Sequence, residues 1–225
     1  MKRRIIETAD GSKTIQLEEW QEQYHSKHGA VQEAYHVFIK HGLEHANHDN
    51  LNILEIGFGT GLNALITLIE SKKKDISIQY VGVEQFPVFL EEVQQLDYVS
   101  SLSAEAFKSE FNTMHQCAWE KKNALSKNFI LTKQKKDFRD ITERDLFNLI
   151  YFDAFGPRVQ PELWTEQIFQ IMYSALKTEG ILVTYSAKGS VRRAMQAVGF
   201  QVERLEGPPG KREMLRGTKT VSIPK

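Results

Sequence analysis

The chain has 225 residues, of which 41% are hydrophobic, and its formal net charge is zero, with 29 basic and 29 acidic side chains. This length predicts one sizeable domain, and the neutral charge balance gives no overall sign of a polyanionic partner. No apolar run is long enough to span a membrane, no secretion signal follows the basic start, and the single cysteine, Cys117, excludes an internal disulfide. We therefore expect a cytoplasmic protein that does not associate with membranes.

The first part of the chain predicts a small extension. Asp10-Gly11 is a hairpin signal between two short strands, Ile5–Thr8 and Thr14–Leu17. A helix from about Ala30 to Ala46 follows, with its apolar side chains on one side. We therefore divide the chain into an N-terminal extension, residues 1–48, and a main domain, residues 49–225.

In the main domain strands alternate with helices, which predicts an α/β fold with a mostly parallel, seven-stranded sheet covered on both faces. The loop Gly207-Pro208-Pro209-Gly210 reverses the chain, so the sheet should end in an antiparallel hairpin. The expected strands are Ile53–Ile56, Ser77–Glu84, Asn128–Leu131, Phe147–Phe152, Gly180–Tyr185, Phe200–Leu205 and Arg212–Arg216. The expected helices are Leu62–Glu70, one opened by Pro87, Ala104–Leu125, Pro161–Leu176 and Val191–Val198.

The first strand of this domain ends at Glu55 and continues into a loop with glycine at positions 57, 59 and 61, after which a helix begins. Such a strand–loop–helix unit holds a nucleoside cofactor at the helix N-terminus. A dinucleotide would need a glycine where Leu62 stands, and Glu55 would repel a pyrophosphate. S-adenosylmethionine (SAM) fits better, because it carries a cationic sulfonium and an ammonium. The plainer alternative is a tight glycine turn without a ligand.

Acidic side chains also follow three later strands, namely Glu84, Asp137 and Asp153. Because the carboxyl ends of parallel strands share one edge, these groups should converge on one cleft with Glu55. Glu84 is placed to accept hydrogen bonds from ribose hydroxyls, and Asp137 could accept one from the adenine amine. The alternatives are an exposed strand end for Glu84 and a helix cap for Asp137 or Asp140.

The loop from Asp153 to Pro157 leaves a strongly apolar strand and should form the boundary between cofactor and substrate. Asp153 can bind a basic nitrogen of the substrate, orient it and take its proton, because an ammonium has no lone pair with which to attack. A turn cap is the alternative for Asp153. Downstream, Trp164 reads as a core residue rather than a stacking platform.

Other chemistries find little support in the sequence. His41, His45 and His48 could share a helix face, but no second ligand motif accompanies them, so we expect no metal. Neither a hydrolase Gly-x-Ser-x-Gly elbow nor a phosphate-binding Gly-Lys-Ser/Thr motif occurs. We expect the lysine clusters at residues 72–74 and 133–136 to be solvated surface.

Over nearly its whole length the chain resembles the methyltransferase half of the MnmC family, bacterial enzymes of the tRNA wobble uridine. The matching residues are Tyr24-His25-Ser26, Gly29, Glu33, the run from Glu55 to Asn63, Glu84-x-Phe86-Pro87, Asp153-x-Phe155-x-Pro157, Pro161-x-x-Trp164, the run from Ser190 to Arg193, Gly199-Phe200 and the run from Lys211 to Gly217. The glycine run and the last run are far more specific than a general SAM motif.

The resemblance implies a class I, Rossmann-like SAM-dependent methyltransferase that acts on tRNA. In the family, a methyl group passes from SAM to the primary amine of 5-aminomethyl-uridine, often 2-thiolated, and gives the 5-methylaminomethyl form. Asp153 then matches the acid that positions the amine. The cofactor-binding residues implied are Tyr24, Glu33, Glu55, Gly57, Phe58, Gly59, Gly61, Asn63, Glu84 and Asp137.

On the tRNA side, the wobble base must leave its stack to enter the cleft, where Phe155 or Phe58 could receive it. The basic groups expected to meet phosphates are Lys188, Arg192, Arg193, Lys211 and Arg212. For Arg212 the alternative is an ion pair with Glu203 or Glu213 inside the terminal hairpin. The flavin-dependent oxidase domain of the full MnmC enzyme has no counterpart here, so the sequence leaves open a separate oxidase partner.

Three other functions stay open at this point. A SAM-dependent N-methyltransferase of a small-molecule amine would act without RNA. A non-catalytic RNA- or protein-binding module with a relic cleft would bind no SAM, and the intact glycine loop and acids argue against it. An NAD-dependent oxidoreductase is disfavoured by the missing third glycine.

Overall fold

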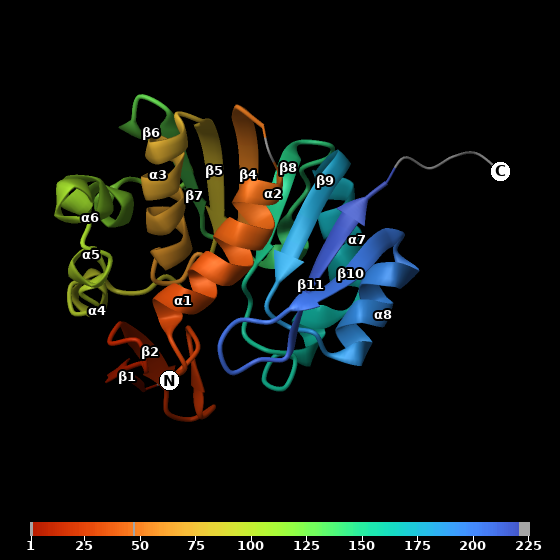
Figure 1. The fold of residues 1–225 in the computed structure, drawn as a ribbon, viewed down its shortest axis with the longest axis horizontal. Coiled ribbons are helices and arrows are strands. Elements are labelled where there is room, and N and C mark those ends of the chain that lie inside the picture. The colour runs from red at the N-terminus through yellow and green to blue at the C-terminus, as the bar shows by residue number, and fades with distance from the viewer. Residues whose placement is uncertain (1, 47, 221–225) are drawn as a thin grey trace.

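Two β-sheets form the framework of the computed structural model, which describes residues 2–46 and 48–220 (Figure 1). The large sheet has eight strands in the spatial order β10 (Phe200–Glu206), β11 (Glu213–Lys219), β9 (Leu176–Thr184), β8 (Phe147–Phe152), β4 (Asn50–Ile56), β5 (Ser77–Val83), β7 (Phe129–Gln134) and β6 (Lys122–Ser126). The small sheet has the order β1 (Arg3–Glu7), β2 (Lys13–Leu17) and β3 (Glu22–Gln23). The large sheet alone carries the alternating strand and helix pattern of the sequence.

The middle of the large sheet is parallel, from β9 through β8, β4 and β5 to β7, and β10, β11 and β6 pair antiparallel at its two sides. The central strands are almost wholly apolar, as strands buried on both faces must be. Glu55 lies opposite Tyr151 of β8 and Gly82 of β5 in the register. All five parallel strands therefore direct their following loops to one edge, with Glu55 near its centre.

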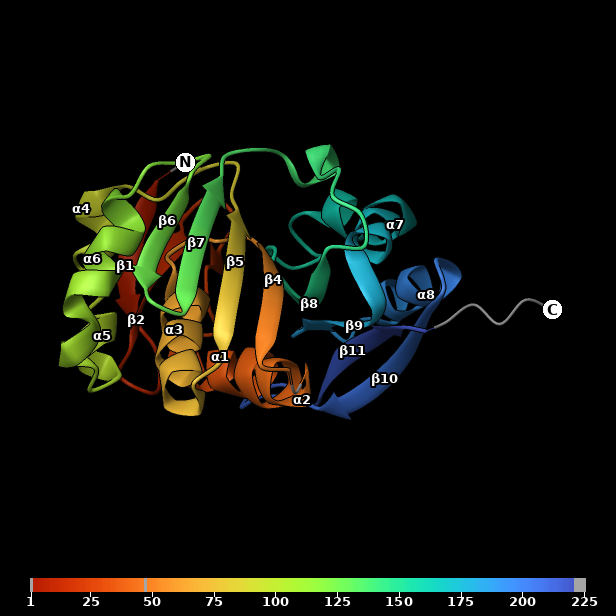
Figure 2. The same cartoon turned by 90° about the horizontal axis from the view of Figure 1, so that it is seen from above.

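Helices cover both faces of the large sheet. They are α1 (Ala30–Ala34), the π-helix η1 (Tyr35–Leu43), α2 (Glu44–Ala46), α3 (Leu62–Lys74), α4 (Leu90–Val93), α5 (Tyr98–Ser101), η2 (Glu105–Phe107), α6 (Lys108–Gln116), η3 (Phe138–Asp140), η4 (Pro161–Trp164), α7 (Glu166–Ala175) and α8 (Gly189–Ala197). One hydrophobic core lies under η1 and α3, and a second lies under α7 and α8. Figure 2 shows α1, α2 and α3 on one side of the strands and α7 on the other.

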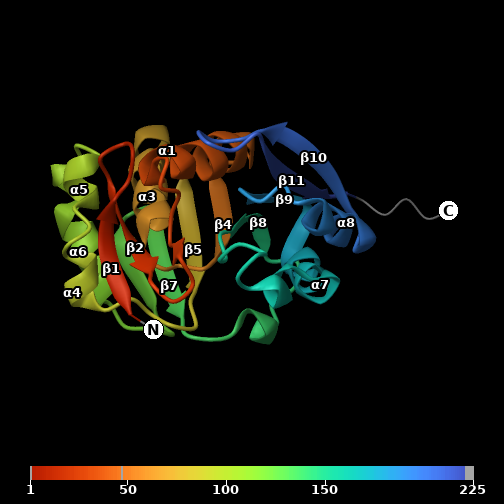
Figure 3. The same cartoon turned by 90° about the horizontal axis from the view of Figure 1, so that it is seen from below.

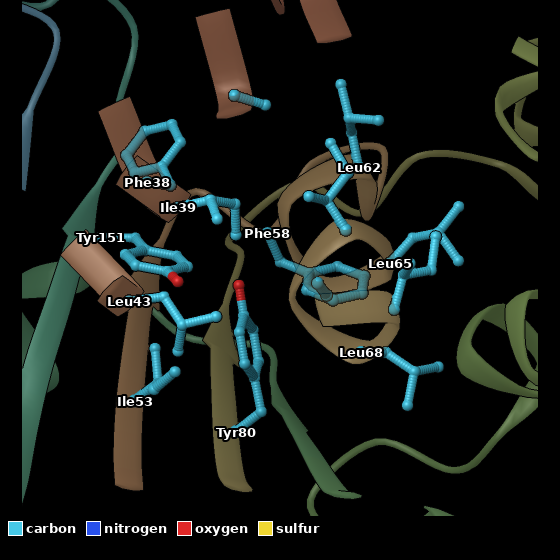
Figure 4. Close-up of a cluster of buried hydrophobic side chains, with 14 of the residues drawn as sticks. Phe38, Ile39, Leu43, Ile53, Phe58, Leu62, Leu65, Leu68, Tyr80 and Tyr151 are labelled. Carbon is cyan, nitrogen blue, oxygen red and sulfur yellow. The ribbon is translucent and has the colours of Figure 1, made fainter. Parts of the chain in front are cut away.

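The first core contains two tyrosines whose hydroxyls are buried with their rings. Tyr80 and Tyr151 are 0% exposed, and Figure 4 shows both oxygens in the middle of the labelled apolar side chains. Phe58 fills the space over Gly82, where an added Cβ would lie 2.4 Å from its ring. Because the Phe58 ring packs here, at 4% exposure, it is poorly placed to receive a base. The expectation that Phe58 could serve as a stacking platform is therefore not supported.

The eight-stranded sheet corrects the expected count of seven, and the additional strand is β6. The predicted helix Ala104–Leu125 ends at Gln116, since the backbone becomes extended at Cys117 (φ −63°, ψ 155°). The chain then returns as β6 and pairs with β7, whose edge would otherwise be unpaired. The small strand β3 was also not expected. The antiparallel hairpin predicted at the end of the sheet is confirmed by β10 and β11.

Two helix starts also differ from the expectation. The helix predicted at Pro87 begins at Leu90, where the Glu92 carboxylate accepts the backbone N–H of Phe89 at 3.0 Å and caps the turn. The predicted helix Pro161–Leu176 is divided into η4 and α7, because Thr165 caps a new start and its hydroxyl accepts the N–H of Ile168 at 3.5 Å.

The N-terminal hairpin is confirmed, with Ile5 of β1 opposite Ile15 of β2. Figure 3 shows β1 and β2 across the edge where the parallel strands end. Ion pairs join this sheet to the main domain, Arg3 to Glu92 at 2.8 Å and Arg158 to Glu22 at 2.9 Å. The helix α1–η1–α2 shares the first core with α3. The division at residue 48 stays a prediction, and residues 1, 47 and 221–225 lie outside the described part.

The part of the chain that the structure describes contains no helix with the length and apolar character needed to cross a bilayer.

Candidate functional site

A cavity of about 620 Å³ opens at the carboxyl edge of the parallel strands. Its walls come from the loops after β4, β5, β7 and β8, and the small N-terminal sheet contributes the remaining side. This volume lies in the range usual for small-molecule and cofactor sites. The structure brings nine of the predicted residues to the cavity wall, namely Tyr24, Gly57, Phe58, Gly59, Asn63, Glu84, Asp137, Asp153 and Phe155.

The glycine loop forms the floor of the cavity and runs into the N-terminus of α3. Gly57 has φ +87°, and a Cβ on it would lie 2.8 Å from the carbonyl oxygen of Asp153, so only glycine lets the loop pass this close to the end of β8. Gly61 precedes α3, and no described side chain caps this helix start. Leu62 and Asn63, in the first turn, line the cavity. Free N–H groups at a helix start suit the carboxylate of an amino-acid moiety.

Glu84 holds the loop from the side of β5. Its Oε2 accepts the N–H of Gly59 at 3.0 Å and its Oε1 accepts the N–H of Phe86 at 2.8 Å. Burial raises the pKa of Glu84. Each carboxylate oxygen can accept a further hydrogen bond, so Glu84 can still bind the two hydroxyls of a ribose.

Asp137 lines the cavity and also caps η3. Its Oδ1 accepts hydrogen bonds from the backbone N–H of Arg139 at 2.9 Å and from the Nε of the same side chain at 2.8 Å. The bond from the Arg139 side chain lowers the pKa of Asp137. The capping alternative is thus present in the structure, and an adenine amine would have to share this carboxylate with Arg139. Phe138 adds an apolar surface beside it.

Asn63 connects two acids at the centre of the site. Its Nδ2 donates to Glu55 Oε1 at 2.9 Å and to Asp153 Oδ2 at 2.8 Å. Glu55 is 1% exposed and lies behind the cavity wall, where the hydroxyl of Tyr80 donates to its Oε2 at 2.9 Å. The structure therefore separates Glu55 from the position beside a cationic ligand that the sequence suggested.

The protonation of Asp153 is set by its surroundings. Burial and the nearby Glu33 carboxylate raise its pKa, whereas the hydrogen bond from Asn63 and the charge of Lys211 lower it, and the net result is a pKa of about 7. Burial also raises the pKa of Glu55 well above its ordinary value. A carboxylate poised near neutral pH is suited to exchange a proton with a bound amine.

The loop after Asp153 is held rigidly beside the cavity. The indole N–H of Trp164 donates to the carbonyl oxygen of Phe155 at 2.8 Å, and the hydroxyl of Tyr185 donates to that of Ala154 at 2.8 Å. The Phe155 ring meets Tyr24 edge-on at 5.0 Å between centroids. Trp164 is 5% exposed, which agrees with its interpretation as a core residue.

Glu33 and Lys211, predicted for the cofactor and for tRNA phosphates, form an ion pair with each other instead. Glu33 is 7% exposed and does not line the cavity, and its other oxygen accepts the N–H of Ser26 at 3.3 Å. The Lys211 ammonium also lies 3.9 Å from the centroid of the Tyr185 ring. The prediction that Lys211 contacts phosphates is therefore corrected, because its charge is already engaged beside Asp153.

The other four predicted cations lie on α8 and the β10–β11 loop, outside the cavity wall. Lys188, Arg193 and Arg212 are exposed and Arg192 is partly so. Within residues 2–46 and 48–220 none of the four has an acidic partner. The hairpin acids expected for Arg212 pair with other arginines, Glu203 with Arg216 and Glu213 with Arg204.

Several cavity residues were missed by the sequence reasoning. The rings of Phe86 and Phe89 are 63% and 68% exposed at the cavity mouth, and Arg3 lies 5.6 Å from the Phe89 centroid. Trp20 packs edge-on against Phe155 at 5.7 Å. Phe86 belongs to the matched run Glu84-x-Phe86-Pro87, although no role was assigned to it. Only tertiary placement reveals Arg3, Trp20 and Phe89 as cavity residues, since a single aromatic in a loop gives no local signal.

His25 also lines the cavity, and only the Tyr24-His25-Ser26 match pointed to it. Its Nδ1 lies 3.1 Å from the hydroxyl of Thr14, and burial lowers its pKa to about 4. His25 is therefore neutral near pH 7 and links the small sheet to the cavity wall.

Two other expectations concern residues away from the cavity. Lys133 is 1% exposed and donates to the carbonyl oxygen of His115 at 2.9 Å, so this member of the lysine cluster is not solvated surface. Among the described residues no group of histidine, cysteine and acidic side chains has a geometry that could hold a metal ion.

The chain is similar to known methyltransferases. A protein-family model described as S-adenosyl-L-methionine-dependent methyltransferase matches residues 97–220, more than half of the chain. The chain is 28% identical over 221 residues to the tRNA 5-methylaminomethyl-2-thiouridine biosynthesis bifunctional protein MnmC of Idiomarina loihiensis, covering 86% of this chain and 35% of that protein. It is 30% identical over 208 residues to the protein of the same name from Ectopseudomonas mendocina, covering 86% and 32%.

Among solved structures, the chain resembles MNMC2 from Aquifex aeolicus, with a TM-score of 0.76 and 24% identity over 100% of this chain and 72% of that one. This likeness supports the predicted Rossmann-like class I methyltransferase fold. The chain spans about a third of the length of the two curated relatives. On the family match, and with a cavity of suitable size at the edge where the glycine loop enters α3, the chain belongs to the S-adenosyl-L-methionine-dependent methyltransferase family.

Proposed function

We propose that this chain transfers a methyl group from SAM to the primary amine of 5-aminomethyl-uridine, with or without a 2-thio group, at the wobble position of tRNA. The observation that carries the proposal is Asp153, a partly buried acid with a pKa of about 7 at the cavity wall beside the glycine loop. The two MnmC proteins to which the chain is similar support the choice of substrate, since their names concern the biosynthesis of 5-methylaminomethyl-2-thiouridine in tRNA.

Different residues of the chain bind the cofactor and the substrate. Bound SAM supplies an electrophilic methyl group on a sulfonium centre. The start of α3 and Glu84 hold its carboxylate and its ribose, and Asp137 with Phe138 receives the adenine. Fixing both reactants at one edge replaces a bimolecular encounter by an oriented one, which is a large part of the rate.

Asp153 prepares the nucleophile. An aliphatic amine arrives largely as an ammonium, which cannot attack until it loses a proton. The Asp153 carboxylate accepts an N–H of this group, aligns it and takes one proton from the ammonium before the attack, which leaves a neutral amine with a free lone pair. Phe155, held by Trp164 and Tyr24, offers an aromatic surface for the uracil ring next to this carboxylate.

The RNA phosphates bind to basic side chains on the β9 side of the cavity. Lys188, Arg193 and Arg212 are exposed there without an acidic partner among the residues described. By contrast, the cavity-lining cations Arg3 and Arg139 are each paired with an acid. We therefore place the RNA backbone over α8 and the β10–β11 loop. The cytoplasm, where tRNA is modified, stays the predicted location.

The test is an incubation of the protein with labelled SAM and tRNA from cells that lack the gene, followed by mass analysis of the nucleosides. We expect 5-aminomethyl-uridine to gain about 14 mass units, one CH₂. The Asp153→Ala variant should bind SAM normally and lose at least about a hundredfold in turnover. Methylation of free amines with no methylation of tRNA would contradict the proposal and favour a small-molecule N-methyltransferase.

A further inference from the structure

Four polar side chains meet at the cavity wall, where Asn63 and Asp153 line the cavity and Glu55 and Tyr80 lie behind them. Glu55 is the penultimate residue of β4, Asn63 lies in the first turn of α3, Tyr80 lies on β5, and Asp153 follows β8. Their hydrogen bonds form one chain, from the Tyr80 hydroxyl to Glu55 at 2.9 Å, and from the Asn63 amide to Glu55 at 2.9 Å and to Asp153 at 2.8 Å. This series of hydrogen bonds therefore connects the buried interior with Asp153, the acid proposed to face the substrate.

We propose that Asn63 is a positioning residue for Asp153, and that Glu55 and Tyr80 act through the Asn63 amide rather than on the cofactor. This inference rests on the proposed function for the role of Asp153 as the group that handles the amine. It revises the roles that the sequence resemblance implied for Glu55 and Asn63, which were both placed in the cofactor set.

Glu55 is fully engaged away from the cavity. It is 1% exposed, it is absent from the cavity wall, and each of its oxygens already accepts one hydrogen bond, Oε1 from Asn63 and Oε2 from Tyr80. A cofactor in the cavity meets Asn63 and Asp153 first. The carboxylate of Glu55 therefore fixes the Asn63 amide.

The amide has only one satisfactory orientation while both acids are ionised. Each of its two N–H groups points to a carboxylate oxygen, and a flipped amide would place its own oxygen against two acceptors. The Asn63 Oδ1 is buried and has no hydrogen-bond partner in the described structure. An unpaired buried acceptor destabilises the fold. The structure accepts this loss at Oδ1 because both N–H groups of Asn63 are used to bind the two acids.

The result is an Asp153 with one fixed and one available oxygen. Its backbone N–H donates to Ile56 at 3.0 Å, and its Oδ2 accepts from Asn63. Its Oδ1 accepts no hydrogen bond from any residue of 2–46 or 48–220. Asn63 thus holds the carboxyl group in one rotamer and leaves Oδ1 for an N–H of the substrate.

Tyr80, at the inner end of this series of hydrogen bonds, is held in place by packing. The Tyr80 ring stacks on Phe129 at 5.6 Å between centroids and is 0% exposed, and Figure 4 shows its hydroxyl among Phe58, Ile39 and Tyr151. A site residue is held most accurately when its supporting partners are themselves locked by packing.

The charges around Asp153 come from several elements, and each affects its titration. Glu33 of α1 raises its pKa, Lys211 of the β10–β11 loop lowers it, and the Asn63 hydrogen bond lowers it as well. The neighbouring groups Glu55, Tyr80 and Tyr185 feel the Asp153 charge in turn. Removing the Asn63 amide alone must therefore raise the Asp153 pKa, with Glu33 and Lys211 unchanged.

The experiment compares Asn63→Ala with the wild type in three measurements, namely ¹³C NMR titration of the Asp153 carboxyl group, SAM affinity by calorimetry, and kcat on tRNA as a function of pH. We expect Asn63→Ala to raise the Asp153 titration midpoint, move the acidic limb of the kcat profile to higher pH and lower kcat at least tenfold. SAM affinity should change less than threefold. Asn52→Ala is the matched control, because Asn52 lies on β4, the strand that carries Glu55, and its side-chain amide donates to the carbonyl oxygen of Leu146 at 3.0 Å, outside the cavity wall.

Two variants at Glu55 separate the possible roles. Glu55→Gln keeps an oxygen for the Asn63 amide and should retain most of kcat and of SAM affinity, whereas Glu55→Ala should behave like Asn63→Ala. A tenfold loss of SAM affinity in Glu55→Gln would overturn the inference, as would an unchanged Asp153 titration and kcat in Asn63→Ala. If Asn63→Ala does not fold, Asn63→Ser, which keeps a donor, is measured instead. If the wild type fails to methylate tRNA, the proposed function fails, and the NMR and calorimetry still decide the role of Asn63.

Discussion

Lys211 and Glu33 are 178 positions apart in the sequence and form an ion pair beside Asp153. Glu33 lies on α1 and Lys211 in the loop between β10 and β11, so the pair joins the N-terminal helix to the terminal hairpin. The two charges act on Asp153 in opposite directions, because Glu33 raises its pKa and Lys211 lowers it. The pair therefore adjusts the acid that is proposed to handle the amine.

The first prediction uses these opposite signs. Lys211→Met should raise the Asp153 pKa, because the Glu33 charge is then uncompensated, and the acidic limb of the kcat profile should move to higher pH. In the double variant Glu33→Gln/Lys211→Met the acidic limb should lie at lower pH than in the wild type. The reason is that Glu33, which raises the Asp153 pKa more than Lys211 lowers it, has also lost its charge. Stability of the single variant should fall by about 1–3 kcal/mol, because a buried carboxylate loses its partner. Equal pH profiles for the three proteins would contradict this account.

The second prediction concerns stability and pH. The folded-state pKa of Asp153 is about 7, above its ordinary value of 3.8, so the folded protein binds a proton more tightly than the unfolded chain. The wild type therefore loses stability as the pH rises from about 4 to 7, and Asp153→Asn does not have this loss. Urea unfolding should show Asp153→Asn more stable than the wild type at pH 8, with a smaller difference at pH 5. Asp145→Asn, at a side chain that is 70% exposed, is the control that should follow the wild type.

The architecture was largely predictable, because the strands of a parallel sheet are buried on both faces and therefore appear in the sequence as apolar runs. Strands such as β8 are continuous apolar runs, and the predicted bounds of β8, Phe147–Phe152, agree with the structure. The glycine loop and the acids Glu84, Asp137 and Asp153 could be located for the same reason, since each follows such a run. β6 was missed because its edge position leaves it mostly polar, with Leu125 as its one buried residue.

The finer parts of the site depended on contacts that no local pattern encodes. Glu55 was predicted to face the cofactor, but whether a strand-end acid points to the cavity or behind it depends on the partner that holds it, here Asn63 and Tyr80. Lys211 looked like a surface cation until the fold brought it to Glu33. Long-range pairings of this kind are fixed by tertiary packing, which a single sequence does not show.

The third prediction concerns the cofactor. Glu84→Ala should weaken SAM binding by about 10–100-fold, because it removes the carboxylate proposed for the ribose and also the acceptor that holds the N–H groups of Gly59 and Phe86. Calorimetry measures the affinity directly. Glu91→Ala, on exposed α4 and outside the cavity wall, is the control and should bind SAM like the wild type. An unchanged affinity in Glu84→Ala would remove this residue from the cofactor site.

The fourth prediction concerns the RNA surface. Lys188→Ala, Arg193→Ala and Arg212→Ala should each weaken tRNA binding and lower the slope of log affinity against log salt concentration by about 1 where a phosphate contact is lost. SAM affinity should not change, because none of the three lines the cavity. Lys122→Ala, on the edge strand β6 at the opposite side of the sheet order, is the control. If Lys122→Ala weakened binding as much as the other three, the RNA would contact the protein only through general charge, and its placement over α8 would be wrong.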